Sequence, residues 1–105
     1  MVLAAMSGAA LLAGGCTWVK LTVPGEGVRV GTVAQVDSCK KLGATHTKTS
    51  TRIAFFSRSQ KKIDAELESL ARNEAADMGG NTIVAQGPTS SEGRRSFDVF
   101  HCSGS

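Results

Sequence analysis

The most regular pattern of hydrophobic and polar positions lies between residues 60 and 80. Apolar side chains recur there at steps of three and four residues, which is the spacing of one face of an α-helix. These positions are Ile63, Leu67, Leu70, Ala71, Ala75 and Met78. Ser57 or Ser59 can cap the amino end of such a helix. Gly79 and Gly80 end it, because glycine adopts the left-handed conformation that satisfies the last free carbonyls. The pattern predicts one long amphipathic helix.

Charged side chains occupy the opposite face of this predicted helix. Lys62 lies one turn before Glu66, and opposite charges at this spacing attract each other. Glu68 and Arg72 repeat the pattern in the next turns. Each pair contributes about 0.3 kcal/mol to an exposed helix. We expect both pairs to lie on the side of the helix that faces solvent.

Two segments before the helix have the pattern of β-strands. In residues 27–36 valines alternate with other residues and then fall out of phase after Gly31, which predicts a strand with a bulge at that glycine. Residues 39–56 are rich in threonine and other β-branched residues, which favours a second strand. We expect these two strands to pair with each other.

Two further strands are predicted after the helix. Residues 82–87 form a short apolar run that is typical of a buried strand, and residues 96–102 alternate apolar with polar side chains. The polar segment 88–95 between them predicts a hairpin loop. Together the patterns predict an α+β domain in which a small four-stranded sheet, in the order ββαββ, packs on one long helix. Four aromatic side chains lie at or near strand positions, and we expect at least two to be core: Phe55, Phe56, Phe97 and Phe100.

The first fifteen residues differ from the rest of the chain. They carry no charged side chain and are too short to span a bilayer, a pattern typical of the apolar region of a signal peptide. A basic segment normally precedes such a region, so we expect the start of the signal peptide to lie upstream. The alternative is a buried core helix, which Gly8, Gly14 and Gly15 disfavour.

The 105 residues suit a single domain, and the hydrophobic fraction of 41% does not favour a disordered or collagen-like chain.

The small residues directly before Cys16 resemble a bacterial lipobox, in which the next cysteine is acylated. Leu12 lies one place earlier than the usual leucine, and Ala13 takes its position. Cleavage before Cys16 would leave a mature chain of 90 residues held by acyl chains. We therefore expect a signal peptide over residues 1–15, a lipidated tether over 16–26 with no regular element, the α+β domain over 27–102 and a tail over 103–105. Trp18 has two equally favoured places, the membrane interface and the domain surface.

Acylation of Cys16 would leave an even pair of cysteines in an exported chain. Cys39 and Cys102 are therefore expected to form a disulfide. Closing this loop would stabilise the folded domain by about 4 kcal/mol. The alternative is a zinc site that adds His46 and His101, but their spacing is poor and neighbouring residues of a strand point to opposite faces. We expect no metal and no cofactor. No pattern of nucleophile, base and acid is present either, so we expect a protein that is not an enzyme.

Charge is distributed unevenly along the chain. Residues 40–62 hold seven basic side chains and no acid: Lys40, Lys41, Lys48, Arg52, Arg58, Lys61 and Lys62. Residues 64–77 hold five acids against Arg72. A basic segment of this kind is attracted to an anionic membrane surface, whereas a solvated surface without a partner is the simpler alternative. Nucleic acid is not expected as a partner, because no aromatic side chains alternate with the lysines.

Several segments together carry a family resemblance. They are the lipobox cysteine, the "KLG" that follows Cys39, the helix end "RNEAADMGGN" with the strand "TIVAQG", and the aromatic-rich strand that ends at Cys102. Over residues 10–102 this arrangement resembles the family of small bacterial lipoproteins called domain of unknown function 4156. It is similar, more distantly, to the outer-membrane sensor lipoprotein of the Rcs phosphorelay, which carries two disulfides where this chain can form one. The resemblance implies an outer-membrane location, since Thr17 is not the aspartate that retains lipoproteins at the inner membrane.

These observations lead to one expected function and two alternatives. We expect a lipid-anchored, periplasm-facing outer-membrane lipoprotein that binds a partner or senses the state of the envelope. One alternative is a structural lipoprotein that contacts peptidoglycan or outer-membrane proteins. A metal-binding protein is the second. The expected partners are the membrane, through the acyl chains on Cys16, and a protein of the envelope.

Overall fold

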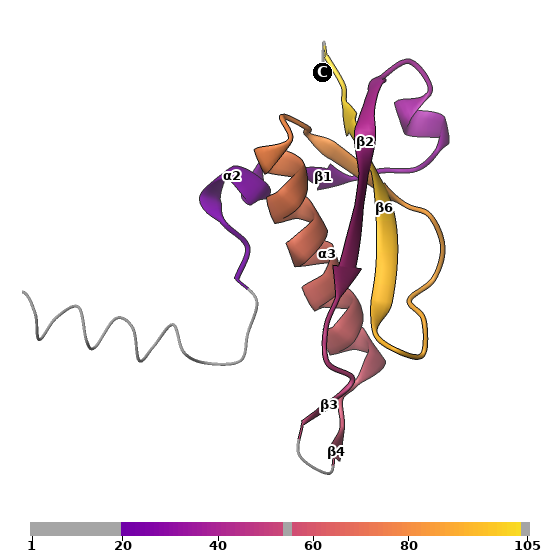
Figure 1. Ribbon diagram of the computed structural model, residues 1–105. Helices are drawn as coiled ribbons and strands as arrows, with labels where there is room; N and C mark the ends of the chain where they lie inside the picture. Colours follow the sequence, from indigo (N-terminus) through magenta and orange to yellow (C-terminus); the bar gives the residue numbers. More distant parts are fainter. Residues whose placement is uncertain (1–19, 54–55, 104–105) are drawn as a thin grey trace, which may run out of the picture.

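A computed structural model describes residues 20–53 and 56–103 of the chain. A four-stranded sheet crosses the long helix α3, which lies against one of its faces (Figure 1). This arrangement confirms the predicted α+β class with a four-stranded sheet and one long helix. The predictions for the signal peptide, Cys16 and Trp18 fall outside the described residues.

The sheet has the strand order β1-β5-β6-β2. Its strands are β1 (Arg29–Val30), β5 (Thr82–Ala85), β6 (Arg94–His101) and β2 (Lys40–Lys48). Strand β1 runs parallel to β5, whereas β5 and β2 both run antiparallel to β6. The predicted hairpin between the last two strands is confirmed, although β6 begins at Arg94, two residues earlier than expected.

The predicted pairing of the first two strands is wrong. Strand β1 is two residues long and pairs with β5, while residues 34–36 form the 3-10 helix η1 (Ala34–Val36). The physical reason lies in the local hydrogen bonds of Thr32 and Gln35. The side chain of Gln35 accepts from the Thr32 backbone N–H at 3.0 Å, and the Thr32 hydroxyl accepts from the Gln35 N–H at 3.3 Å. Such side-chain bonds turn the chain where a strand would continue.

The second predicted strand, over residues 39–56, divides into two parts. Strand β2 ends at Lys48, and residues 52–57 form a separate two-stranded sheet of β3 (Arg52–Ile53) and β4 (Phe56–Ser57). Strand β2 pairs with β6 from Lys40 opposite His101 at one end to Lys48 opposite Arg94 at the other, with a bulge between Lys41 and Gly43. The two ends of this ladder therefore lie at opposite ends of the sheet.

Helix α3 (Gln60–Asp77) follows the predicted pattern closely. Ser59 is the N-cap, and its side chain accepts from the Lys62 backbone N–H at 3.2 Å. Four of the predicted apolar positions are buried, namely Ile63, Leu67, Ala71 and Ala75. Leu70 is half-buried, and Met78 is 39% exposed because the helix ends at the residue before it. Gly79 then has a φ of 85°, the left-handed conformation expected at this end.

The core lies between α3 and the sheet. Its buried members are Val28, Ala71, Ala75, Ile83, Phe97 and Val99. A second, smaller cluster of Val36, Val84 and Cys102 lies elsewhere on the sheet, with Phe100 packed against it. At least two of the four phenylalanines were expected in the core, and of these Phe97 is fully buried and Phe100 is half-buried. Phe55 and the side chain of Phe56 lie outside the described part of the chain.

A short helix precedes the sheet where no regular element was predicted. Helix α2 (Val23–Glu26) is capped by Thr22, whose side chain accepts from the Gly25 N–H at 3.0 Å. The side chain of Asn73 on α3 accepts from the Thr22 N–H at 2.8 Å and donates to the Lys20 carbonyl at 3.0 Å. Residues 20–26, expected to belong to a tether, are therefore held against the domain.

Arg72 takes part in the same contact rather than in the predicted pair with Glu68. Its Nε donates to the Val28 carbonyl at 2.7 Å, and its Nη2 donates to the Glu26 carbonyl at 3.3 Å. The carbonyls of Glu26 and Val28 lie at and just beyond the end of α2, where no helical N–H reaches them, and the guanidinium of Arg72 supplies the donors. Across residues 20–53 and 56–103, no helix is both long and apolar enough to cross a bilayer.

Candidate functional site

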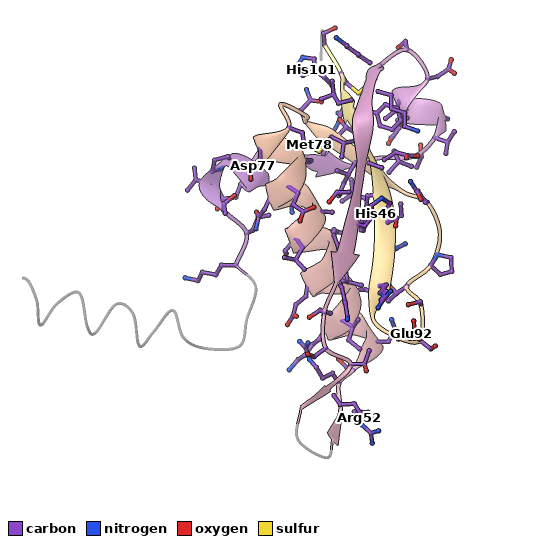
Figure 2. All side chains as sticks on the ribbon, in the orientation of Figure 1. His46, Arg52, Asp77, Met78, Glu92 and His101 are labelled. Carbon is purple, nitrogen blue, oxygen red and sulfur yellow. A yellow bond between two sulfur atoms is a disulfide. The ribbon has the colours of Figure 1, made fainter. Side chains whose placement is uncertain are left out.

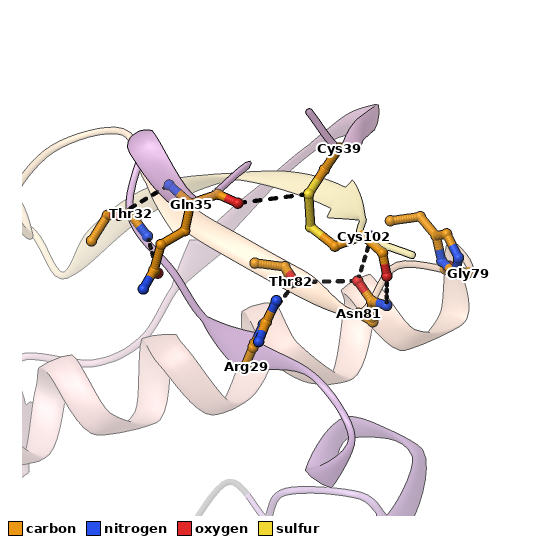
Figure 3. Close-up of a disulfide and its surroundings, with 9 residues drawn as sticks. Arg29, Thr32, Gln35, Cys39, Gly79, Asn81, Thr82 and Cys102 are labelled. Carbon is orange, nitrogen blue, oxygen red and sulfur yellow. Dashed lines mark hydrogen bonds between the residues drawn. A yellow bond between two sulfur atoms is a disulfide. The ribbon is translucent and has the colours of Figure 1, made fainter. Parts of the chain in front are cut away.

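The expected disulfide closes one end of the β2–β6 ladder, where β2 begins and β6 ends. Cys39 and Cys102 are bonded, with their Cα atoms 4.6 Å apart (Figure 3). Asn81 holds the second cysteine in place, because its side chain donates to the Cys102 carbonyl at 2.7 Å and accepts from the Cys102 N–H at 2.8 Å. The predicted pairing is confirmed. The bridge spans a sequence separation of 63 residues, for which loop closure contributes about 4 kcal/mol.

The histidines of the alternative zinc site lie apart from each other. His46 contacts Ser96, with Nδ1 2.7 Å from the hydroxyl oxygen, whereas His101 lies at the disulfide end with Nδ1 3.3 Å from the Gly79 carbonyl (Figure 2). The sulfurs of Cys39 and Cys102 are bonded to each other and are therefore not thiolate ligands. Among the residues described, no group of three or more histidine, cysteine or acidic side chains is arranged to hold a metal ion.

The basic side chains gather at the other end of the β2–β6 ladder. We call this region the basic tip and define it as residues 48–53, 56–66 and 88–95. It contains seven basic and three acidic side chains. Lys40 and Lys41, which belong to the same basic run of the sequence, lie at the disulfide end instead. Arg94 and Arg95 lie at the tip instead, because β6 pairs with β2. The sequence could have indicated these two cations only if the pairing of β2 with β6 had been predicted.

A buried ion pair fixes the backbone of the basic tip to α3. The guanidinium of Arg58 binds the carboxylate of Glu66, and their side chains are only 8% and 7% exposed. Arg58 Nη1 also donates to the Ser50 carbonyl at 2.9 Å, and the Thr49 hydroxyl donates to Glu66 Oε1 at 2.7 Å. Both ends of the segment 49–58 are therefore fastened to one carboxylate. Satisfying both charges with further hydrogen bonds is what makes such a pair tolerable in the interior.

The predicted position of Glu66 on the solvent face of α3 is therefore wrong. The sequence placed Glu66 one turn after Lys62, but the side chain points inward because Arg58 and Thr49 bind it there. The hydrogen bond from Arg58 lowers the pKa of Glu66, and the one from Thr49 lowers it further. The same bond with Glu66 raises the pKa of Arg58. Both groups are charged at neutral pH.

A second set of polar contacts fixes the loop between β5 and β6. The Thr89 hydroxyl donates to Asp64 Oδ1 at 2.6 Å, and the Gln60 amide donates to the same oxygen at 2.8 Å. These two bonds, that from Thr89 first, lower the pKa of Asp64. At the far side of the loop, Arg95 donates to the Gly87 carbonyl at 2.7 Å. The loop is thus tied to the first turn of α3 and to β6.

Cavities open beside these contacts on the surface of the basic tip. One of about 520 Å³ is lined by Lys48, Thr49, Ser50, Thr51, Arg52 and Glu92. A second of about 310 Å³ shares Thr51 and Arg52 with it and reaches Ser57, Arg58 and Gln60 at the start of α3. The linings consist mostly of hydroxyl and cationic side chains, with Arg52 on β3 and Glu92 on the loop between β5 and β6 (Figure 2). Such a surface is suited to binding an anion and has no nucleophile paired with a base.

These features define a small α+β domain stapled by one disulfide, with a basic tip at the opposite end of its sheet. The chain matches, over residues 19–102, the family described as Domain of unknown function (DUF4156), and it belongs to this family. The predicted membership of this family is thereby confirmed. Neither a curated protein nor a solved structure matches the chain.

Proposed function

We propose that the protein is a lipid-anchored, periplasm-facing lipoprotein of the outer membrane that acts as a binding or envelope-sensing module and not as an enzyme. The observation that carries the proposal is the partition of the three cysteines. Two of them form the disulfide of the domain, which leaves Cys16 as the odd one. Disulfides persist in exported proteins and are rare in the cytosol. The apolar segment before Cys16 supplies the export signal that this location requires.

The packing of α2 supports anchoring close to the bilayer. Lys20 is fastened to Asn73 on α3 and lies only four residues after Cys16. Four extended residues span at most roughly 14 Å, so acyl chains on Cys16 would hold the domain near the headgroups. Thr17 favours sorting to the outer membrane, as the family resemblance implies.

The basic tip supports a binding role. Three of its cations, Lys48, Arg52 and Arg58, line cavities that also carry hydroxyl groups. The ion pair between Arg58 and Glu66 fastens the adjacent backbone to α3. Preorganised surfaces of this kind bind with a smaller loss of conformational entropy. A structural role at peptidoglycan or at an outer-membrane protein is the alternative, and a metal-binding role is disfavoured because Cys39 and Cys102 are joined.

Fractionation of cells that express the full chain tests the anchor. Cys16→Ser should release the protein from the membrane fraction into the periplasm, because no acyl chain can be added. Thr17→Ser is the matched control and should remain in the outer membrane, whereas Thr17→Asp should move the protein to the inner membrane. Tight membrane attachment of the Cys16→Ser variant would overturn the proposal.

Crosslinking in intact cells separates the two roles. A sensing module should crosslink to an envelope protein in amounts that change under envelope stress, whereas a structural lipoprotein should give constant crosslinks to peptidoglycan or to outer-membrane proteins. Stoichiometric zinc in the purified protein would instead favour the metal-binding role.

A further inference from the structure

We infer that the basic tip binds phosphate groups through Lys48, Arg52 and Arg94, with the hydroxyl groups of Ser50 and Thr51 as additional donors. This inference deepens the proposed binding role by naming the ligand chemistry and the residues, and it does not depend on the anchor at Cys16. Phosphate is the shared chemistry of two sources, a lipid headgroup and a soluble phosphorylated compound.

The first supporting observation is a pair of like charges. Lys48 and Arg94 are direct partners in the register of β2 and β6, so both side chains project from the same face of the sheet. Both are exposed. Like charges at directly opposite positions destabilise a sheet. A bound anion would remove this repulsion. The facing pair therefore favours an anion-binding site, because the packing of the sheet does not itself require two like charges at opposite positions.

The second observation is that these cations are uncommitted. Throughout residues 20–53 and 56–103, no hydrogen bond or ion pair engages the side chain of Lys48, Arg52 or Arg94. By contrast Arg58 is bound to Glu66, and Arg95 donates to a backbone carbonyl and lies 5.4 Å from the ring centroid of Phe97. The tip therefore separates cations that hold the fold from cations that are available to a ligand.

The third observation is the shape beside these cations. The cavity of about 520 Å³ has Lys48 at one end of its lining segment and Arg52 at the other, with three hydroxyl-bearing residues between them. A guanidinium binds two phosphate oxygens at once, an ammonium acts as a point charge, and hydroxyl groups donate to the remaining oxygens. The amino end of α3 lies beside the second cavity, and its dipole adds positive potential.

Phosphate fits this combination better than a single carboxylate. A phosphate monoester carries close to two negative charges at neutral pH and three acceptor oxygens. Lys48, Arg52 and the hydroxyl donors in the cavity lining can therefore bind its oxygens, with Arg94 opposite Lys48 in the ladder. Glu92 also belongs to the cavity lining, and its negative charge opposes any anion there. Removing this charge should strengthen phosphate binding.

The length of α3 makes a lipid headgroup a reachable source. Thirteen residues separate Gln60 at the tip from Asn73 at the anchor side, which corresponds to roughly 20 Å along the helix. A domain lying along the bilayer would bring both the tether and the tip to its surface. Anionic headgroups attract basic clusters that lie near the membrane surface.

The test uses the full chain with Cys16→Ser, so that no acyl chain contributes to binding. Calorimetric titration with inorganic pyrophosphate measures the affinity of the tip at fixed ionic strength. The double variant Lys48→Gln and Arg94→Gln should weaken this affinity by at least about tenfold, because two charge-assisted contacts are lost. Glu92→Gln should strengthen it. Lys40→Gln with Lys41→Gln removes the same charge at the other end of the sheet and should leave the affinity unchanged.

Two further arms identify the source and test the selectivity. Flotation with vesicles of phosphatidylcholine and phosphatidic acid, whose headgroup is a phosphate monoester, should show the same dependence on Lys48 and Arg94 if the ligand is a headgroup. Pyrophosphate binding without vesicle binding assigns a soluble phosphate. Both results support phosphate recognition. Equal affinity for citrate, equal weakening by the two double variants, or no binding of either probe would overturn it. None of these outcomes bears on whether Cys16 is acylated in cells.

Discussion

The two ends of the β2–β6 ladder are held by different kinds of interaction. At one end, a covalent bond joins Cys39 to Cys102, and apolar side chains pack around it. At the basic tip, the ion pair of Arg58 and Glu66 holds the chain in place of a covalent bond. Arg58 also donates to the backbone carbonyl of Ser50. The first end responds to reducing agents, and the second responds to pH. The comparison shows that one small sheet can combine a covalent closure at one end with a polar, charged closure at the other.

The largest effect is expected at the disulfide end. Replacing both cysteines, Cys39→Ala with Cys102→Ala, should lower the free energy of unfolding by about 4 kcal/mol, because the unfolded chain regains the freedom that the closed loop removes. Urea denaturation measures this change. Reduction of the unaltered protein serves as the control and should produce a loss of the same size. A loss below about 1 kcal/mol would show that the bridge contributes little to the stability of the domain.

The next effect is expected at the basic tip. Glu66→Gln should lower the free energy of unfolding by about 3 kcal/mol, since it leaves the buried guanidinium of Arg58 without its counter-charge. The double variant Arg58→Met with Glu66→Leu should recover most of this loss, because no buried charge remains. Glu74→Gln, at an exposed position of α3, is the control and should change stability little. A double variant as unstable as Glu66→Gln would contradict the role assigned to the pair.

A smaller effect is expected from the backbone turn at the tip. Gly93 has a φ of 79°, and an added Cβ would lie 2.4 Å from the Thr49 carbonyl oxygen. Gly93→Ala should therefore cost about 2 kcal/mol through strain and displacement of the neighbouring strand end. Gly87→Ala is the matched control in the same loop, where an added Cβ meets nothing within 4 Å. Thermal unfolding measured side by side would refute the assignment if the two variants behaved alike.

The smallest effect is the response to acid. The carboxylates of Glu66 and Asp64 have lowered pKa values in the folded protein. Between these lowered values and the ordinary pKa of a carboxyl group, the unfolded chain therefore binds more protons than the folded one. Their contribution to stability is complete above about pH 4, where unfolded carboxyl groups ionise, and is lost as the pH falls through the lowered pKa values. Urea titrations between neutral and acidic pH should show this decline, reduced in the double variant Arg58→Met with Glu66→Leu. A decline of the same size in that variant would assign the acid response to other groups.

The sequence predicted the long helix, the last two strands and the disulfide because each depends on local periodicity or on simple counting. The apolar stripe of α3, the run after Gly80 and the even pair of cysteines needed no information from distant parts of the chain. The partner of β1 could not be predicted, because two residues carry too little pattern to choose among strands. Helix α2 could not be predicted either, because its placement depends on the contact between Thr22 and Asn73, which lie far apart in the sequence.

The basic tip was predicted only in part. The basic run over residues 40–62 indicated an anionic partner, but the pairing of β2 with β6 divides that run and adds Arg94 to one end. The buried position of Glu66 was missed, because a carboxylate one turn from a lysine resembles an exposed helix pair. A signal was present in the placement of Arg58 just before the N-cap, where its side chain can reach back along the first turns of α3.

Mass spectrometry of the protein extracted from cell envelopes determines the state of all three cysteines in one experiment. After digestion with trypsin, we expect an amino-terminal peptide of residues 16–20 that carries acyl chains on Cys16. We also expect that residues 30–40 and 96–105 are recovered as one linked pair that separates on reduction. An intact leader before residue 16, an unmodified Cys16, or free thiols at Cys39 and Cys102 would contradict the account.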